Sequence, residues 1–143
     1  MMFLLDTNVI SELRKAGDGR ANEHVVAWTL TCRSETMHVS VISLMELEIG
    51  ILRIERRDRD QGRLLRSWFD DHVMPEFAGR ILAVDSEVAL RCARLHVPDP
   101  RTERDALIAA TALVNDMSVV TRNAADFSTT GVHVIDPWAT AAH

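Results

Sequence analysis

Residues 2–6 read Met-Phe-Leu-Leu-Asp, a short apolar run that stops at a carboxylate. Such a run predicts a strand that is buried on both faces, as in a parallel sheet. Four further runs at residues 37–41, 81–84, 118–121 and 132–135 are also predicted to be strands. The chain is therefore expected to form a buried sheet of short strands.

The segments between these runs carry helical patterns. The clearest is residues 43–57, where Leu44, Leu47 and Ile51 recur at spacings of three and four. The other predicted helices span residues 9–13, 22–32, 59–77, 86–96 and 102–117. Strands that alternate with helices imply right-handed crossovers and a mainly parallel sheet covered on both faces. We expect one α/β domain over residues 1–143, with its working crevice beyond the carboxyl ends of the strands.

Composition excludes several classes of protein. The chain has 143 residues, of which 47% are hydrophobic and 26% charged, unlike a disordered tail, a collagen-like repeat or a disulfide-stapled miniprotein. No apolar run approaches the roughly 20 residues that span a membrane, and the first residues lack the basic region of a signal peptide. We expect a cytoplasmic protein in which Cys32 and Cys92 are small buried thiols. The spacing of the histidines matches no zinc motif.

Four carboxylates are predicted to meet at one edge of the sheet. Asp6 ends the first strand, Asp126 follows the fourth, and Glu46 and Asp105 each lie one turn into a helix. Each also has an ordinary structural explanation. The segments that lead to Glu46 and Asp105 both fit a capping box, Asp6 could cap the helix that follows it, and Asp126 could lie in a turn.

Four carboxylates at one edge would need a counter-charge. Two of them about 4 Å apart repel by roughly 4 kcal/mol at an effective dielectric near 20. A hard divalent cation, Mg²⁺ or Mn²⁺, takes oxygen ligands and retains several waters. In an open crevice such an ion suits phosphoryl chemistry, where it activates water and stabilises in-line displacement.

Four motifs, in this order, resemble those of the PIN-domain ribonucleases: Leu4-Leu-Asp-Thr-Asn-Val-Ile-Ser11, Ser43-x-x-Glu-Leu-x-x-Gly50, Asp105-Ala-Leu-Ile-Ala-Ala-Thr-Ala112 and Val120-Thr-Arg-Asn-x-x-Asp-Phe127. Within that superfamily the chain resembles a VapC or FitB-type toxin of a bacterial toxin–antitoxin pair. The resemblance implies a three-layer α/β/α fold around a five-stranded parallel sheet. It implies RNA cleavage that depends on Mg²⁺ or Mn²⁺ and leaves a 5′-phosphate and a 3′-hydroxyl. It also implies a homodimer and a small antitoxin that blocks the site, in a hetero-oligomer able to bind DNA.

By position, the resemblance makes Asp6 and Asp105 the principal metal ligands. Glu46 would complete the cluster by binding the metal through water or by orienting the nucleophile. The fourth acid is where the sequence departs from part of the family, because many members place an acid where this chain has Asn123. Asp126, three residues further on, could take that role, or Asn123 could supply a carbonyl oxygen or a hydrogen bond to water.

Polar residues beside the acids are candidates for holding them in place. Thr7 and Asn8 follow Asp6 directly, and Thr121 follows the fourth strand. Both positions suit hydrogen-bond donors that orient a metal ligand. Arg122 is a candidate for the same role and for a phosphate contact. Ordinary turn and capping hydrogen bonds are the alternative for all four residues.

The charge of the chain is unevenly spread. A formal net charge of −5 excludes a protein that coats nucleic acid by bulk charge. Between residues 53 and 66, however, six arginines stand against three acids, which gives a local charge of +3. This stretch is either a solvated, salt-bridged face or a positive rim that steers RNA phosphates towards the carboxylates. Arg53 and Arg57 are the candidate contacts.

Two functions remain in competition. One is an endoribonuclease toxin that hydrolyses RNA phosphodiesters with metal-activated water. The other is a catalytically weak PIN-fold binding module acting through protein or RNA, which Asn123 keeps open. A haloacid-dehalogenase-like phosphatase is excluded because Asp6 is followed by Thr-Asn and lacks a second Asp. A phosphoacceptor receiver domain is excluded because it needs an acidic pair and a late lysine, and Lys15 is the only lysine.

Overall fold

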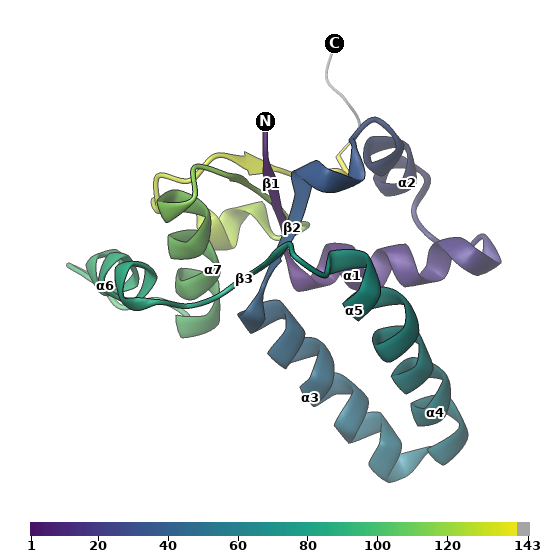
Figure 1. Ribbon diagram of the computed structural model, residues 1–143. Helices are drawn as coiled ribbons and strands as arrows, with labels where there is room; N and C mark the ends of the chain where they lie inside the picture. The colour runs from purple at the N-terminus through teal and green to yellow at the C-terminus, as the bar shows by residue number, and fades with distance from the viewer. Residues whose placement is uncertain (140–143) are drawn as a thin grey trace.

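The computed structural model describes residues 1–139, and five short strands in it form one parallel sheet (Figure 1). They are β1 (Phe3–Leu5), β2 (Met37–Ser40), β3 (Ile81–Leu82), β4 (Ser118–Val120) and β5 (Val134–Ile135). The order across the sheet is β3-β2-β1-β4-β5, and every neighbouring pair is parallel. The predicted α/β class and the five-stranded parallel sheet are confirmed, with β1 at the centre.

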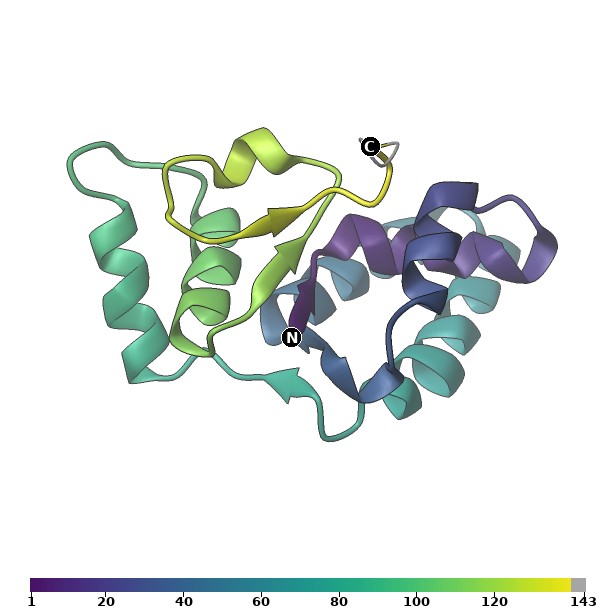
Figure 2. The same ribbon diagram turned by 90° about the horizontal axis from the view of Figure 1, so that it is seen from above.

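Helices cover both faces of the sheet. They are α1 (Thr7–Arg14), α2 (Glu23–Leu30), α3 (Val41–Arg57), α4 (Arg59–Trp68), α5 (Met74–Phe77), α6 (Ser86–Leu95) and α7 (Glu103–Val114). Figure 2 shows α6 and α7 on one side of the strands and α1 and α2 on the other. The chain is thus the expected three-layer α/β/α structure.

The alternation of side chains along β1 explains why the sheet needs cover on both faces. Leu4 packs with Val119 of β4 and with Ile108 of α7. Leu5, the next residue, belongs to the opposite core with Val120 and with residues of α1. All of these strand side chains are fully buried, so neither face of the central strands meets solvent.

Several predicted helix boundaries are wrong. Helix α1 begins at Thr7 rather than at residue 9, and α7 ends at Val114 rather than at residue 117. Two further differences have a clear local cause. Helix α3 begins at Val41 rather than at residue 43, because the hydroxyl of Ser40 accepts the Ile42 amide at 3.0 Å and caps the helix. The helix predicted over residues 59–77 is divided into α4, a π-helical turn (Phe69–Val73) and α5. Pro75 accounts for the wider turn, because its ring cannot occupy regular α-helical geometry against the preceding turn.

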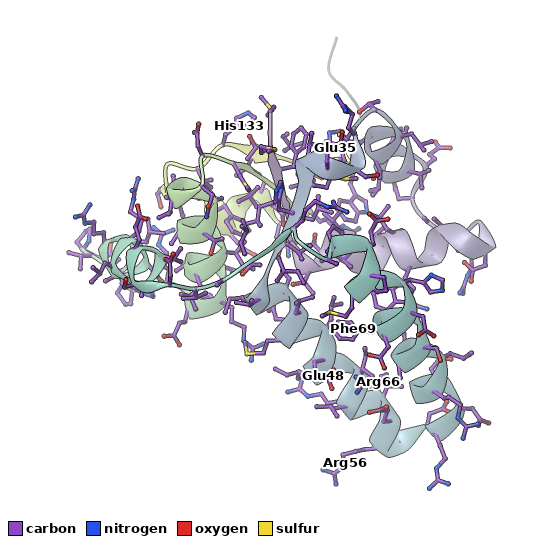
Figure 3. The ribbon with its side chains drawn as sticks, in the orientation of Figure 1. Glu35, Glu48, Arg56, Arg66, Phe69 and His133 are labelled. Atoms are coloured by element: carbon purple, nitrogen blue, oxygen red, sulfur yellow. The ribbon has the colours of Figure 1, made fainter. Side chains whose placement is uncertain are left out.

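Helices α3 and α4 form an antiparallel hairpin that extends away from the sheet (Figure 1). The Arg66 guanidinium lies between the two helices, 2.6 Å from Glu48 and 3.1 Å from Glu55 (Figure 3). Gly62 permits this close packing, since a Cβ there would lie 2.7 Å from the Glu55 Cα. These contacts hold α3 and α4 together along the hairpin.

Two further expectations concern membranes and thiols. Within residues 1–139 there is no helix both long and apolar enough to cross a membrane. Cys92 is buried, Cys32 is half-buried, and both are free thiols.

Candidate active site

The site is built around Asp6, at the end of the central strand. Asp6 is 6% exposed, and its carboxylate caps α1, where Oδ1 accepts the Thr7 backbone amide at 2.8 Å. The other oxygen, Oδ2, accepts the Thr121 hydroxyl at 2.8 Å and the Asn8 amide at 3.4 Å. Asp6 therefore caps α1 and also accepts hydrogen bonds from Asn8 and Thr121.

Thr121, directly after β4, joins three segments of the site. Its hydroxyl is buried, donates to Asp6, and accepts the side-chain amide of Asn8 at 3.3 Å and the backbone amide of Asn123 at 3.0 Å. The side-chain oxygen of Asn8 in turn accepts the Arg122 amide at 3.2 Å. Parallel pairing of β1 and β4 brings these residues together at adjacent strand ends.

Glu46 reaches the site from α3. One carboxylate oxygen accepts the Thr7 hydroxyl at 2.6 Å, and the other lies 3.7 Å from the guanidinium of Arg104. The capping-box explanation for Glu46 is wrong, because Ser40 caps α3 and Ser43 lies inside the helix. Within the described residues the buried Ser43 hydroxyl has no hydrogen-bond partner. Glu46 is thus free to face the sheet edge rather than its own helix terminus.

Asp105, in the first turn of α7, is the least compensated of the four acids. The capping box predicted here does not form either, since the Thr102 side chain makes no capping hydrogen bond. Burial is the largest influence on the Asp105 carboxyl, and repulsion by neighbouring carboxylates adds to it, raising its pKa to about 6. Those neighbours are Asp6, Asp126 and Glu46.

The same repulsion acts on Asp6. Burial raises the pKa of Asp6 above its ordinary value, and the charges of Glu46 and Asp126 raise it further. Hydrogen bonds from Thr121 and from the Thr7 amide stabilise the ionised form and lower the pKa in part. The four carboxylates brought to one edge of the sheet therefore interact electrostatically with one another.

Asn123 and Asp126 are the two candidates for the fourth position of the acidic cluster. Asn123 precedes a 3₁₀ turn (Ala124–Phe127) and joins the network through its backbone. Asp126 lies in that turn with an exposed side chain, and its charge acts on both Asp6 and Asp105. The negative charge near this strand end is thus supplied by Asp126.

The donor set fits a hard divalent cation. Every candidate ligand is a carboxylate oxygen, and the raised pKa values of Asp6 and Asp105 reflect negative charge that a cation would offset. Across residues 1–139 no three acidic, histidine or cysteine side chains converge closely enough to ligate one ion directly. An ion at this edge would therefore contact at most two of these side chains directly.

The arginines predicted to contact RNA lie in two places. Arg53 and Arg57 are exposed on α3 and line a groove that also includes Thr7 and Glu46. Arg122 is exposed beside the Asp6 network, and its guanidinium lies 5.5 Å from the ring centroid of Trp138.

Sequence reasoning missed Arg104, the one cation within 4 Å of a candidate ligand among the described residues. Its position beside Asp105 in the first turn of α7 was the available signal. A cation beside an acid on a helix usually points elsewhere, however, so the sequence does not reveal that Arg104 reaches Glu46.

Comparisons with known proteins find relatives along nearly the whole chain. A family model described as the PIN domain matches residues 3–132. The VapC ribonuclease Y4jK of Sinorhizobium fredii is 36% identical over 148 residues, covering 98% of this chain and 100% of that protein. Toxin FitB of Neisseria gonorrhoeae is 34% identical, covering 96% of this chain and 99% of its own. The solved structure of FitAB bound to an IR36 DNA fragment superposes with a TM-score of 0.88 at 33% identity, covering 99% of both chains.

Proposed function

The chain belongs to the PIN domain family, and from that premise we propose that it is a metal-dependent endoribonuclease, the toxin of a toxin–antitoxin pair. The observation that carries the proposal is the gathering of Asp105 and three other carboxylates at one edge of the sheet, near enough for their charges to act on one another. Similarity along nearly the whole chain to a VapC ribonuclease and to toxin FitB supports RNA as the substrate. The products would carry a 5′-phosphate and a 3′-hydroxyl.

In this proposal Asp6 and Asp105 are the principal ligands of Mg²⁺, with Mn²⁺ as a substitute, and Glu46 and Asp126 complete the cluster. The bound cation would supply positive charge against the phosphodiester and lower the pKa of an attacking water. Asp6 is oriented by Thr121, and Asp105 brings a carboxylate that is ionised fully only above its raised pKa.

The hydrogen-bonded neighbours would keep the acids in place for this chemistry. Thr7 donates a hydrogen bond to one oxygen of Glu46. The other oxygen, which lies 3.7 Å from Arg104, would orient the attacking water. Asn8 and Asn123 tie the β1 and β4 strand ends to Thr121. Such support is what holds a ligand in a productive geometry. Arg122, Arg53 and Arg57 would contact phosphates of the substrate.

The proposed partners follow from the same relatives. We place the toxin in the cytoplasm as a homodimer that a small antitoxin inhibits. The FitAB structure bound to DNA supports a toxin–antitoxin hetero-oligomer that binds DNA.

The test compares wild type with Asp6→Asn and Asp105→Asn, and uses Asp70→Asn as a matched control, because Asp70 is exposed on the π-helical turn. Each protein is incubated with total RNA and Mg²⁺, new 5′ ends are sequenced, and melting temperature is followed as Mg²⁺ is added. We expect new 5′-phosphate ends from wild type and the control, and none from the two site variants.

Cleavage by either site variant at the wild-type rate would refute the assignment of that acid to the metal site. A wild type that neither cleaves RNA nor melts at a higher temperature with Mg²⁺ or Mn²⁺ would instead indicate the binding module.

A further inference from the structure

The segment that follows β5 lies beside the segment that follows β4. The two strands are parallel neighbours, and the Thr121 backbone amide extends their pairing by donating to the Ile135 carbonyl at 2.9 Å. The Asp136 carboxylate then accepts the Trp138 backbone amide at 2.9 Å, which forms a tight turn. Figure 2 shows this last segment, in yellow, passing from β5 towards α1. Trp138 is thereby brought to the strand end that carries Arg122.

The side chain of Arg122 is held at both of its ends. Its backbone amide donates to the Asn8 side chain at 3.2 Å, which ties it to the Asp6 network. Its guanidinium lies 5.5 Å from the ring centroid of Trp138, within the range of cation–π attraction. Trp138 is half-buried and packs against the apolar core on the α1 side of the sheet, so its ring is itself held in place.

The N–H donors of this guanidinium remain available. Arg122 is exposed, and within residues 1–139 its guanidinium forms neither an ion pair nor a hydrogen bond. Its charge acts on Glu12 of α1, but that carboxylate already accepts the Asn22 amide at 2.8 Å and the Lys15 ammonium at 3.3 Å. The five donors of an arginine lie in the guanidinium plane and suit phosphate oxygens. A ring that contacts the flat face leaves those donors free.

A second arginine–aromatic pair in the protein shows the contrast. Arg80 lies 5.2 Å from the ring centroid of Phe77, but it also donates to the Met37 carbonyl at 2.6 Å and pairs with Glu76 at 2.6 Å. The donors of Arg80 are therefore used to join segments of the fold. The Arg122 guanidinium makes no such connection within the described residues, so the fold alone does not explain its position.

Contact with a ring also prepares an arginine to bind. An exposed arginine side chain samples many rotamers, and a ligand has to order it on binding. A guanidinium that already rests on a fixed ring loses less conformational freedom, so its phosphate contact is stronger.

We propose that Trp138 is a positioning residue, which holds the Arg122 guanidinium beside the sheet edge to bind a phosphate of the RNA substrate. The proposal rests on the proposed function and adds the segment after β5 to the site. Trp138 acts through Arg122 and does not contact the reacting atoms.

A double-mutant cycle tests this coupling with Arg122→Gln, Trp138→Leu and the combined variant. Trp138→Phe, which retains an aromatic face, is the rescue variant. The matched control is Phe77→Leu, which removes the ring from the other arginine–aromatic pair. For each protein, affinity for an unstructured RNA oligomer is measured over a salt series in EDTA, kcat and KM are measured with Mg²⁺, and thermal unfolding verifies the fold.

We expect Trp138→Leu to weaken oligomer binding about two- to fivefold, the value of an exposed cation–π contact, and to raise KM with little change in kcat. Trp138→Phe should recover most of the affinity, and Phe77→Leu should bind like wild type. Arg122→Gln should lower the slope of log K against log salt by about 0.7, as one phosphate contact does. In the Arg122→Gln background, Trp138→Leu should have no further effect.

Three outcomes would overturn the proposal. One is an unchanged affinity of Trp138→Leu. Another is an equal loss from Trp138→Leu with and without Arg122, which would mean that the ring contacts RNA itself. The third is a Trp138→Phe variant as weak as Trp138→Leu, which would indicate that the indole only fills space.

A measurement on the wild type covers the case in which Trp138→Leu does not fold. The indole ring should shift the Arg122 Cδ proton resonances upfield, and Arg122→Gln assigns them by their loss. The shift should persist when the RNA oligomer is added in EDTA. Its absence, or its disappearance on RNA binding, would also overturn the proposal.

The two proposals fail separately. Wild-type cleavage with a KM that Trp138→Leu leaves unchanged would refute the positioning role and keep the ribonuclease. RNA binding that depends on Arg122 and Trp138 together, without any cleavage by wild type, would refute the ribonuclease and keep the positioning role.

Discussion

Replacing Asp105 with asparagine should stabilise the folded protein above neutral pH. In the wild type the Asp105 carboxyl accepts no hydrogen bond from any residue in the described range and faces three other carboxylates. Ionising the carboxyl therefore costs more free energy in the folded protein than in the unfolded chain. Asparagine has nearly the same shape and no charge, so it removes this cost while preserving the packing of α7.

The magnitude follows from the pKa. Folding raises the pKa of Asp105 from 3.8 to about 6, so its favourable contribution is present in acid and is lost as pH rises through 6. At roughly 1.4 kcal/mol per pKa unit, the full effect is about 3 kcal/mol. Because the carboxyl is partly exposed and water screens the repulsion, we expect about 2 kcal/mol. For a domain of this size that corresponds to about 6 °C in melting temperature.

Urea unfolding in EDTA between pH 4 and pH 8 measures this difference, with Asp70→Asn as the control for loss of an exposed acid. The advantage of Asp105→Asn should grow with pH, level off above about pH 7 and nearly vanish at pH 4. Adding Mg²⁺ should stabilise wild type more than the variant, because the ion offsets the charge that the variant lacks. A stability gain that is the same at pH 4 and pH 8, or absent at pH 8, would refute the electrostatic reasoning.

Two further substitutions test the support of the site and the packing of the hairpin. Thr121→Val should abolish RNA cleavage and lower the free energy of unfolding by about 1–3 kcal/mol, because buried Asp6 loses a hydrogen bond. The control Thr111→Val loses a hydrogen bond to a backbone carbonyl within α7 and should still cleave RNA. A fully active Thr121→Val would contradict the role of Thr121 in orienting Asp6. Gly62→Ala should lower stability by about 1–3 kcal/mol by overpacking against Glu55. Gly50→Ala, with open space at its Cβ, should raise the free energy of unfolding by about 0.5–1 kcal/mol. Thermal unfolding measures both glycine variants. Equal effects of the two changes would show that the close packing of Gly62 against Glu55 does not matter.

Much of the fold could be predicted because the information is local. The run that ends at Asp6 is apolar at consecutive positions, and only a strand covered on both faces buries Leu4 and Leu5 together. The start of α3 could not be fixed in this way, since Ser40 and Ser43 are both suitable caps by type. The choice between them depends on where β2 ends, and a strand end is set by pairing with distant strands.

The positions of the site acids could be predicted, but their contacts could not. The rule that parallel strands end at one edge brings Asp6 near Thr121, although 115 residues separate them. No local pattern indicates that the Thr121 hydroxyl points at Asp6, or that Arg104 reaches Glu46 from a different helix. Likewise, the arginine stretch is one feature in the sequence. Only the packing of α3 against α4 distinguishes Arg66, which is paired, from the other arginines of the stretch, which form no ion pair within residues 1–139.

The four acids are unequal in a way that suits binding of an ion. Asp6 is buried and held by three donors, and Glu46 is held by one hydroxyl with a distant guanidinium. Asp105 and Asp126 accept no hydrogen bond from any residue in the described range, and their charges repel each other. A fixed carboxylate gives an incoming cation a defined position, while unsatisfied ones gain the most from its charge. The free energy released on binding would therefore arise chiefly at Asp105, so that removing it should weaken ion binding without disturbing the hydrogen bonds that orient Asp6.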